Sequence, residues 1–127
     1  MQAIAALALV VPDYEAAIEF YVNVMGFDLV EDVDQGRKRW VRVSPPEGRG
    51  ASLILARAEG KPQRAAIGDQ AGGRVFLFLE TDDFDRDYAR MQGAGVVFEE
   101  APRQETYGKV AVWSDPFGHR WDLLEHH

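Results

Sequence analysis

The chain has 127 residues, of which 46% are hydrophobic and 28% charged, values typical of one soluble globular domain. Its formal net charge of −7 disfavours binding to nucleic acids and to anionic membrane surfaces, which requires clustered lysine and arginine side chains. Cysteine is absent, so disulfides, thiolate metal sites and cysteine nucleophiles are excluded.

The ends of the chain carry no predicted secretion or membrane segment. The apolar segment 4–11 has no basic region before it, and Pro12-Asp13 follows at once, which argues against a signal peptide. No apolar run approaches the roughly 20 residues that span a bilayer. We therefore expect a cytoplasmic protein. Residues 125–127, Glu-His-His, are interpreted as a tag remnant and are left out of the functional argument.

The first half of the chain is predicted to form a strand, a helix and three further strands. Residues 4–11 alternate between larger and smaller apolar side chains, which indicates a strand whose larger face meets a helix. Asp13 is expected to cap a helix over residues 13–25, and Gly26 to end it. Short strands are then predicted at about 27–33, 37–44 and 51–57.

The second half repeats this order after residues 58–73, which have no clear period and are predicted to be a linker, either a lid or a mobile segment. A strand is expected at 75–81, then a helix capped by Asp82 or Asp83, which Gly95 ends. Further strands are predicted at about 96–100, 109–114 and 119–124.

An internal comparison supports a repeat. An offset of 69 residues pairs Asp13 with Asp82 and Gly26 with Gly95, whereas the apolar helix positions match better at 70. The predicted fold class is therefore α+β, with two βαβββ modules at about 1–57 and 74–124 in a single domain, 1–124.

Both halves carry segments that resemble a known family. Residues 11–21, followed by Met25-Gly26-Phe27, resemble the first-helix signature of the vicinal oxygen chelate superfamily, which includes glyoxalase I, bleomycin resistance proteins and dioxygenases. Residues 81–84, 95–96, 107–108 and 115–123 stand in the order that this superfamily shows. The resemblance implies curved mixed sheets that form two halves of a cup, commonly within a homodimer. It specifies activity weakly, because this fold hosts many chemistries.

The resemblance also implies where a metal would bind. Enzymes of the superfamily hold a divalent metal through His and Glu ligands on the first and last strands of each module. The matching positions here are Ala6, Ile54, Phe76 and Asp122. Three of these side chains have no ligating atom, and one carboxylate does not hold Zn²⁺ or Ni²⁺ against water. We therefore expect no metal and no other cofactor.

The strongest candidate site residue is Asp122, which should face the cup between Trp121 and Leu123, two residues that pack on the helix. It is either a partly solvated strand acid, or one paired with Arg120 or another cup residue, or an anion that orients a cationic ligand or acts as a base if burial raises its pKa. Phe76 and Phe78 share its predicted face, where they either line a site for an aromatic ligand or fill the cup as core.

Three further candidates lie along strands. Trp40 is expected either to wall the pocket or to pack in a dimer interface. Arg42 could pair with Asp122 or with an anionic substrate group. Glu80, at a strand end, is expected to be a solvated rim residue rather than a catalytic one.

The last candidates lie in loops. Glu105 and Tyr107 would place an acid and a hydroxyl group at the cup mouth, or would belong to an ordinary surface loop. His119 follows a glycine turn and is expected to be a surface imidazole rather than a catalytic base.

These observations favour metal-independent binding of a small, partly aromatic ligand, as in the bleomycin resistance branch that the chain resembles. The net charge and the nearby acids make a cationic ligand reasonable. The alternative is a glyoxalase-like lyase, isomerase or dioxygenase with a non-standard site, in which Asp122, Glu105 or Tyr107 does acid–base work. A third possibility is a structural or partner-binding domain with a packed cup. The expected ligand contacts are Trp40, Ile54, Phe76, Phe78, Glu80, Tyr107 and Asp122.

Overall fold

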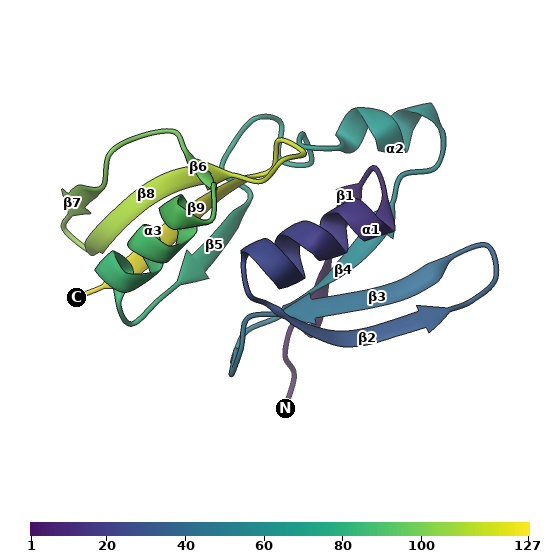
Figure 1. Ribbon diagram of the computed structural model, residues 1–127, viewed down its shortest axis with the longest axis horizontal. Coiled ribbons are helices and arrows are strands. Elements are labelled where there is room, and N and C mark those ends of the chain that lie inside the picture. The colour runs from purple at the N-terminus through teal and green to yellow at the C-terminus, as the bar shows by residue number, and fades with distance from the viewer. The chain divides into compact units, whose positions relative to one another are not determined.

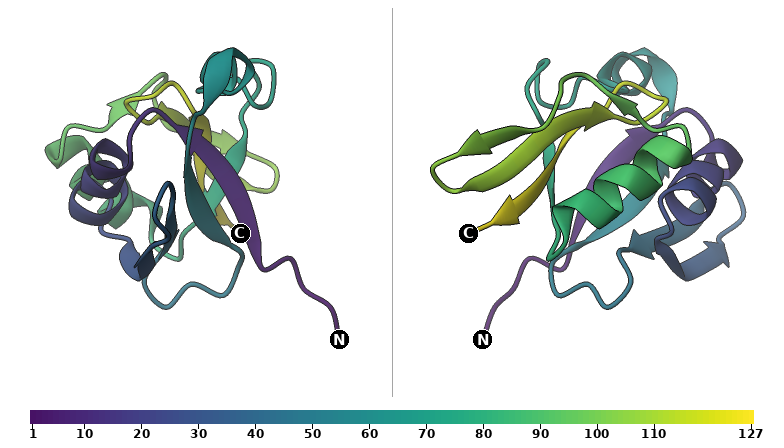
Figure 2. Two further views of the ribbon diagram at one scale, coloured as in Figure 1. Left: turned by 90° about the vertical axis from the view of Figure 1, so that its right-hand side faces the viewer. Right: turned by 60° about the vertical axis from the view of Figure 1, so that its left-hand side comes forward.

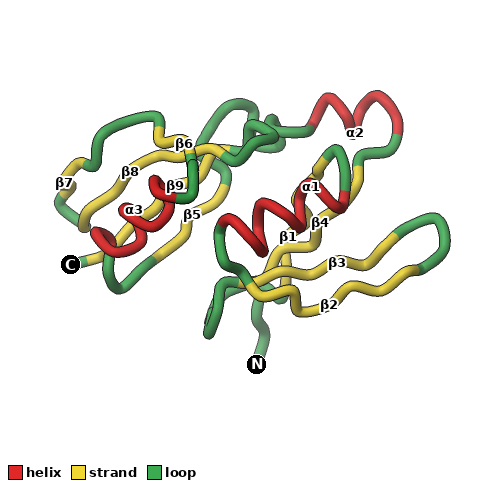
Figure 3. Tube along the Cα trace, in the orientation of Figure 1, coloured by secondary structure: helices red, strands yellow, loops and turns green.

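The computed structural model describes residues 1–127 and divides the chain into two units, residues 1–67 and 68–127. Each unit contains one β-sheet with a helix on one of its faces (Figures 1 and 2). The order of helices and strands along the chain can be followed in Figure 3. The predicted α+β class, with two sheets of mixed strand orientation, is confirmed. No helix in the structure has both the length and the apolar character needed to cross a bilayer.

The first unit contains a four-stranded sheet in the order β1–β4–β3–β2. β1 runs parallel to β4, whereas β3 is antiparallel to both of its neighbours. The strands are β1 (Ala6–Val11), β2 (Asp28–Asp34), β3 (Arg39–Ser44) and β4 (Ser52–Arg57). All four strands were predicted, with small differences at their ends.

The core of the first unit lies between this sheet and the helix that follows β1. Leu9 and Val11 are wholly buried, as the alternation along the first strand predicted. Burial of each such side chain contributes roughly 1.5–3 kcal/mol to folding. From the helix, Ala17 and Tyr21 are also wholly buried. This packing uses one face of the sheet and leaves the opposite face outside the core.

The helix of the first unit changes its hydrogen-bonding pattern midway. Asp13 caps its start, with Oδ2 accepting a hydrogen bond from the backbone N of Ala16 at 3.0 Å. The first part is α-helical, α1 (Tyr14–Ile18), and the second part is π-helical, η1 (Glu19–Val24). In the wider π turn, the backbone N of Met25 donates to the carbonyl of Phe20, five residues back, at 2.8 Å.

The π-helical segment explains the one-residue slip in the internal repeat. Asp83, rather than Asp82, caps the helix of the second unit, so the two capping residues stand 70 positions apart. Gly26 and Gly95, both with positive φ, end the helices and stand 69 positions apart. The first helix therefore contains one more residue than the second, and the π turn accommodates it.

The segment predicted as a linker without regular structure contains a short helix, α2 (Gly60–Ala66). Seven residues make about two turns, too few to show an amphipathic period in the sequence. Near its start, the backbone N of Glu59 donates to Oε1 of Gln63 at 2.8 Å.

The second unit contains a five-stranded sheet in the order β5–β9–β8–β6, and β7 also pairs with β8. Its helix, α3 (Phe84–Gly93), lies on the face that contains the stacked rings of Trp113 and Trp121, whose centroids are 4.9 Å apart. The strands are β5 (Leu77–Glu80), β6 (Val97–Phe98), β7 (Arg103–Glu105), β8 (Gly108–Ser114) and β9 (Arg120–His126).

The strand predicted at 96–100 is interrupted, and β7 was not predicted. Pro102 lies between β6 and β7 and has no N–H group to donate to a neighbouring strand. In the interruption, the side chain of Glu100 replaces a backbone acceptor: its Oε1 accepts a hydrogen bond from the backbone N of Val112 at 3.2 Å. This contact satisfies a donor that the broken strand would otherwise leave unpaired.

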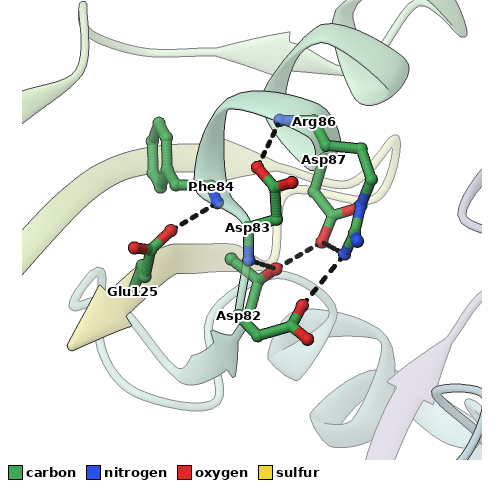
Figure 4. A network of polar contacts seen from close by, with 7 residues as sticks. Asp82, Asp83, Phe84, Arg86, Asp87 and Glu125 are labelled. Atoms are coloured by element: carbon green, nitrogen blue, oxygen red, sulfur yellow. Dashed lines mark hydrogen bonds and ion pairs between the residues drawn. The ribbon is translucent and has the colours of Figure 1, made fainter. Parts of the chain in front are cut away.

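Two side chains, those of Asp83 and Glu125, accept hydrogen bonds from the first backbone donors of α3 (Figure 4). Oδ1 of Asp83 accepts from the backbone N of Arg86 at 3.1 Å. Oε1 of Glu125 accepts from the backbone N of Phe84 at 2.6 Å. Glu125 therefore joins the end of β9 to the start of α3, and its interpretation as a tag residue stays a prediction.

Candidate functional site

The face of the second sheet opposite α3, which we call the second open face, contains Asp122. This residue pairs directly with Phe78 of β5 and with Val112 of β8, and paired residues on neighbouring strands point to the same side. Its chain neighbours Trp121 and Leu123 are buried on the opposite side. Asp122 thus lies in a row with one aromatic and one aliphatic side chain.

The carboxyl group of Asp122 is only partly compensated by its surroundings. Its Oδ1 is buried and has no hydrogen-bond partner. Burial raises the pKa of Asp122, the negative charge of Glu100 adds to this rise, and the positive charges of Arg103 and Arg120 oppose it. The group therefore binds a proton more readily than an ordinary aspartate does.

Large apolar side chains lie beside Asp122 and remain exposed. Phe78 is 64% exposed and Val97 is 65% exposed, while Phe76 is half-buried. Val97 belongs to the same face because it pairs with Ser114, which in turn pairs with Arg120. Phe78 therefore does not fill the core of its unit, and it offers an aromatic surface next to a carboxyl group.

Two arginines near Asp122 are paired with glutamates. Nε of Arg120 lies 2.9 Å from Oε2 of Glu99, and Nη1 of Arg120 donates to the carbonyl of Gly73 at 2.8 Å. Nε of Arg103 lies 3.1 Å from Oε1 of Glu100. The pairing of Asp122 with Arg120, one of the alternatives considered from the sequence, is replaced by the pair of Arg120 with Glu99.

The other candidates of the second unit lie towards the far end of this face. Glu105 forms an ion pair with Arg103 and pairs with Gly108, two side-chain rows from Asp122 along β8. Tyr107, in the turn that leads into β8, is exposed. The structure therefore does not bring Glu105 next to Asp122.

Glu80, at the end of β5, is exposed, and its Oε2 lies 3.1 Å from Nδ1 of His126. The sequence suggested a solvated rim residue at this position.

The face of the first sheet opposite α1, the first open face, contains a connected polar group. Oε1 of Glu31 accepts from Nε of Arg42 at 2.7 Å and from Nε1 of Trp40 at 3.2 Å. Nη1 of Arg42 donates to Oγ of Ser52 at 2.5 Å, and its guanidinium carbon lies 5.7 Å from the Trp40 ring centroid. The hydrogen bond from Arg42 is the main reason that the pKa of Glu31 is lowered.

The four positions that correspond to the superfamily's metal ligands lie on the open faces of the two sheets, Ala6 and Ile54 in the first sheet and Phe76 and Asp122 in the second. In the first sheet, Ile54 pairs directly with Ala8, while Ala6 is one row further along. In the second sheet, Asp122 pairs directly with Phe78 rather than with Phe76. On either assignment, Asp122 is the one side chain with a ligating atom. No cluster of three or more histidine or acidic side chains suitable for a metal ion is found.

The expectation that His119 is a surface imidazole is wrong. The side chain is 1% exposed, and its Nδ1 lies 3.1 Å from Oδ2 of Asp115, which is also buried. Oδ1 of Asp115 accepts from the backbone N atoms of Phe117 and His119, both at 2.9 Å, so the turn folds back over the carboxyl group. Burial lowers the pKa of His119, and the charge of Asp115 partly opposes this. In the sequence, Asp115 stands four residues before His119, and this spacing could have indicated that the two side chains pair.

Comparison with known proteins identifies the family. The model of the Glyoxalase/Bleomycin resistance protein/Dioxygenase superfamily matches residues 3–123. The chain belongs to this superfamily. The resemblance found in the first helix signature and in the second half is thereby confirmed.

Several known proteins are similar to this chain over nearly its whole length. An uncharacterized protein of Shewanella frigidimarina (strain NCIMB 400) is 57% identical over 126 residues, covering 98% of this chain and 93% of the relative. The structure of TnmS3, an antibiotic binding protein from Streptomyces sp. CB03234, has a TM-score of 0.80 and 32% identity, covering 100% of this chain and 98% of that one. A glyoxalase/bleomycin resistance protein from the same Streptomyces strain has a TM-score of 0.75 and 34% identity, covering 96% and 99%.

Several residues of the two open faces were not found from the sequence. Glu31 and Val97 were not considered, and Glu99, Arg103 and Arg120 were not assigned to a site. The residues of β2 do not alternate between polar and apolar, and the register shifts between Leu29 and Glu31, so no local pattern indicated Glu31. The short β6 and its interruption gave no periodic signal for Val97 and Glu99.

Proposed function

We propose that this protein binds a small, partly aromatic, positively charged organic molecule on its open sheet faces, without a metal ion. The observation that carries the proposal is the row formed by Phe78, Asp122 and Val112. It combines an exposed aromatic ring with an incompletely compensated carboxyl group. A cation with an aromatic group would contact both, through ring stacking and a charge-assisted hydrogen bond.

The similarity to TnmS3 supports binding as the activity, because that protein is described as an antibiotic binding protein and is 32% identical over the whole chain. The positions of the superfamily's metal ligands also favour it, since Ala6, Ile54 and Phe76 supply no donor atom. The first open face carries Trp40 and Ile54, which would offer apolar contact to a ligand bound on that face.

An enzyme is the second candidate, and one observation favours it: burial raises the pKa of Asp122, a property of many general acids and bases. A second titratable group within hydrogen-bond reach would strengthen this candidate, but Glu105 lies two rows away and is paired with Arg103. A glyoxalase-like lyase, isomerase or dioxygenase activity therefore ranks below binding.

A binding screen tests the proposal. Aromatic amines and cationic antibiotics would be titrated into the protein after treatment with a chelator, and amide chemical shifts would be followed by NMR. We expect saturable shifts at residues of β5 and β9, weakened in Phe78→Ala and unchanged in the control Val30→Ala, which removes an exposed apolar side chain from β2. Binding that requires an added metal, or product formation from a bound compound, would contradict the proposal and favour the enzyme.

We also propose that the protein is a homodimer, as the resemblance implies, and that it lies in the cytoplasm. Sedimentation equilibrium of the purified protein would test the dimer, and a monomer at micromolar concentration would contradict it.

A further inference from the structure

We propose that Asp122 is the group that recognises an ammonium ion on the second open face, and that ammonium and proton compete for its carboxyl group. This inference rests on the proposed function and names the ligand class: an aryl group joined to an amine by a short linker. It adds a pH dependence that follows from the surroundings of Asp122.

The hydrogen bonding of the Asp122 carboxyl group favours a bound cation. Oδ1 of Asp122 is buried and accepts no hydrogen bond. An ionised carboxylate in this state lacks the donors that normally offset its desolvation, so it gains either from a bound proton or from a bound cation. Aspartates that serve only as solvated strand residues have both oxygens in water, which differs from the arrangement here.

The neighbouring aromatic ring of Phe78 favours an aryl group on the ligand. Phe78 pairs with Asp122 across β5 and β9, and neighbouring strands lie about 4.8 Å apart. An arylalkylamine whose ring rests on the exposed Phe78 ring can therefore place its ammonium group at the carboxyl group one strand away. A ligand without the ring would lose the apolar contact, and one without the amine would leave Asp122 uncompensated.

The charged groups around Asp122 are paired with one another. Arg120 is paired with Glu99, and Arg103 is paired with Glu100 and Glu105, so both guanidinium groups are engaged by other acids. From β5, the charged neighbour is Glu80, which contacts His126. From β8, the facing residues Val110, Val112 and Ser114 are uncharged. Asp122, unlike these other acids, has no basic side chain paired with it and can therefore pair with a cationic ligand.

The sign of the pH effect follows from these groups. Burial and the charge of Glu100 raise the pKa of Asp122, while Arg103 and Arg120 lower it. A bound ammonium group adds a positive charge and lowers that pKa. By linkage, affinity for the amine is highest when Asp122 is ionised, and it falls as the pH drops through the pKa of the free protein.

The experiment uses two probes of one shape, benzylammonium and the neutral benzyl alcohol, with the full chain. NMR would record amide shifts for affinity and the ¹³Cγ shift of Asp122 for its titration. We expect Asp122→Asn to lower the affinity for benzylammonium about tenfold, which is the loss expected for a hydrogen bond to a charged group. The affinity for benzyl alcohol should change less than about twofold. Saturating benzylammonium should lower the titration midpoint of Asp122.

Asp85→Asn provides the matched control, because it removes one negative charge from α3, on the other side of the same sheet. Equal weakening by Asp85→Asn and Asp122→Asn would overturn the inference, since only overall charge would then matter. Benzyl alcohol binding as tightly as benzylammonium would also overturn it; metal-independent binding of an aromatic molecule would stand, without the preference for a cation. Failure of both probes to shift any resonance at millimolar concentration would count against both proposals. Amide spectra of the free variants would check that each is folded.

Discussion

The buried ring of His119 lies against the buried carboxyl group of Asp115, with Nδ1 of the ring 3.1 Å from Oδ2. On its other side, Nε2 of His119 accepts a hydrogen bond from the backbone N of Gly68 at 3.4 Å. Because Nε2 accepts, the neutral ring carries its proton on Nδ1, towards Asp115. Protonation of Nε2 would remove this acceptor, so the folded second unit favours the neutral form of His119.

This arrangement predicts that the free energy of unfolding decreases at acidic pH. Burial lowers the pKa of His119 below its ordinary value of about 6.5, so the unfolded chain takes up the proton first. The free energy of unfolding should therefore hold its full contribution from His119 above about pH 6.5 and decrease as the pH falls towards the lower, folded-state pKa. Urea unfolding between pH 8 and pH 5 would measure this decrease.

The matched variants for this pH effect are His119→Gln and His126→Gln. The first should be less stable at pH 8 and lose much of the pH dependence, whereas the second changes an exposed ring and should keep it. An equally steep pH dependence in His119→Gln would show that another group is responsible.

Gly68 is predicted to be intolerant of a side chain. A Cβ atom at this position would lie 2.5 Å from the carbonyl oxygen of Phe117, and the φ of 73° is a left-handed conformation. Gly72 has a φ of 65° but nothing within 4 Å of a Cβ atom, so it shares the strain without the clash. We expect Gly72→Ala to cost about 1 kcal/mol and Gly68→Ala about 3 kcal/mol. Equal midpoints in urea unfolding would contradict this.

Glu100 is predicted to stabilise the interruption between β6 and β7. Glu100→Ala would leave the backbone N of Val112 without its acceptor and should cost about 1–2 kcal/mol. Glu100→Gln keeps an Oε1 atom that can accept, and should cost less. Amide hydrogen exchange at Val112 provides the local measurement: it should accelerate in Glu100→Ala, and unchanged exchange there would disprove the role.

Trp40 is predicted to account for most of the collisional quenching of tryptophan fluorescence. Trp113 is 0% exposed and Trp121 is 4% exposed, whereas Trp40 lies half-buried on the first open face. Trp40→Phe should therefore remove most of the emission that acrylamide quenches, while Trp121→Phe should not. If quenching persists in Trp40→Phe, one of the stacked tryptophans is reached by solvent through motion of the second unit.

Local sequence patterns predicted the strands and capping residues because these depend on neighbours within a few positions. Alternation in 119–124 places Trp121 and Leu123 on one face and Asp122 on the other, as the structure shows. Asp13 and Gly26 were recognised as the start and end of a helix from residue type alone. The α1–η1 change was not predicted, because π-helical turns are rare and occur mostly as single turns inside α-helices.

The sequence by itself determined the α+β class, the repeated order of elements, the family and the side of the sheet to which Asp122 points, since periodicity reports which face of an element is apolar. Only the tertiary structure decided which side chains contact one another. His119 is buried because Asp115 and the distant Gly68 enclose it, and Oδ1 of Asp122 lacks a hydrogen-bond partner because Glu99 and Glu100 engage the nearby arginines. Such pairings join residues far apart in the chain, and no local period records them.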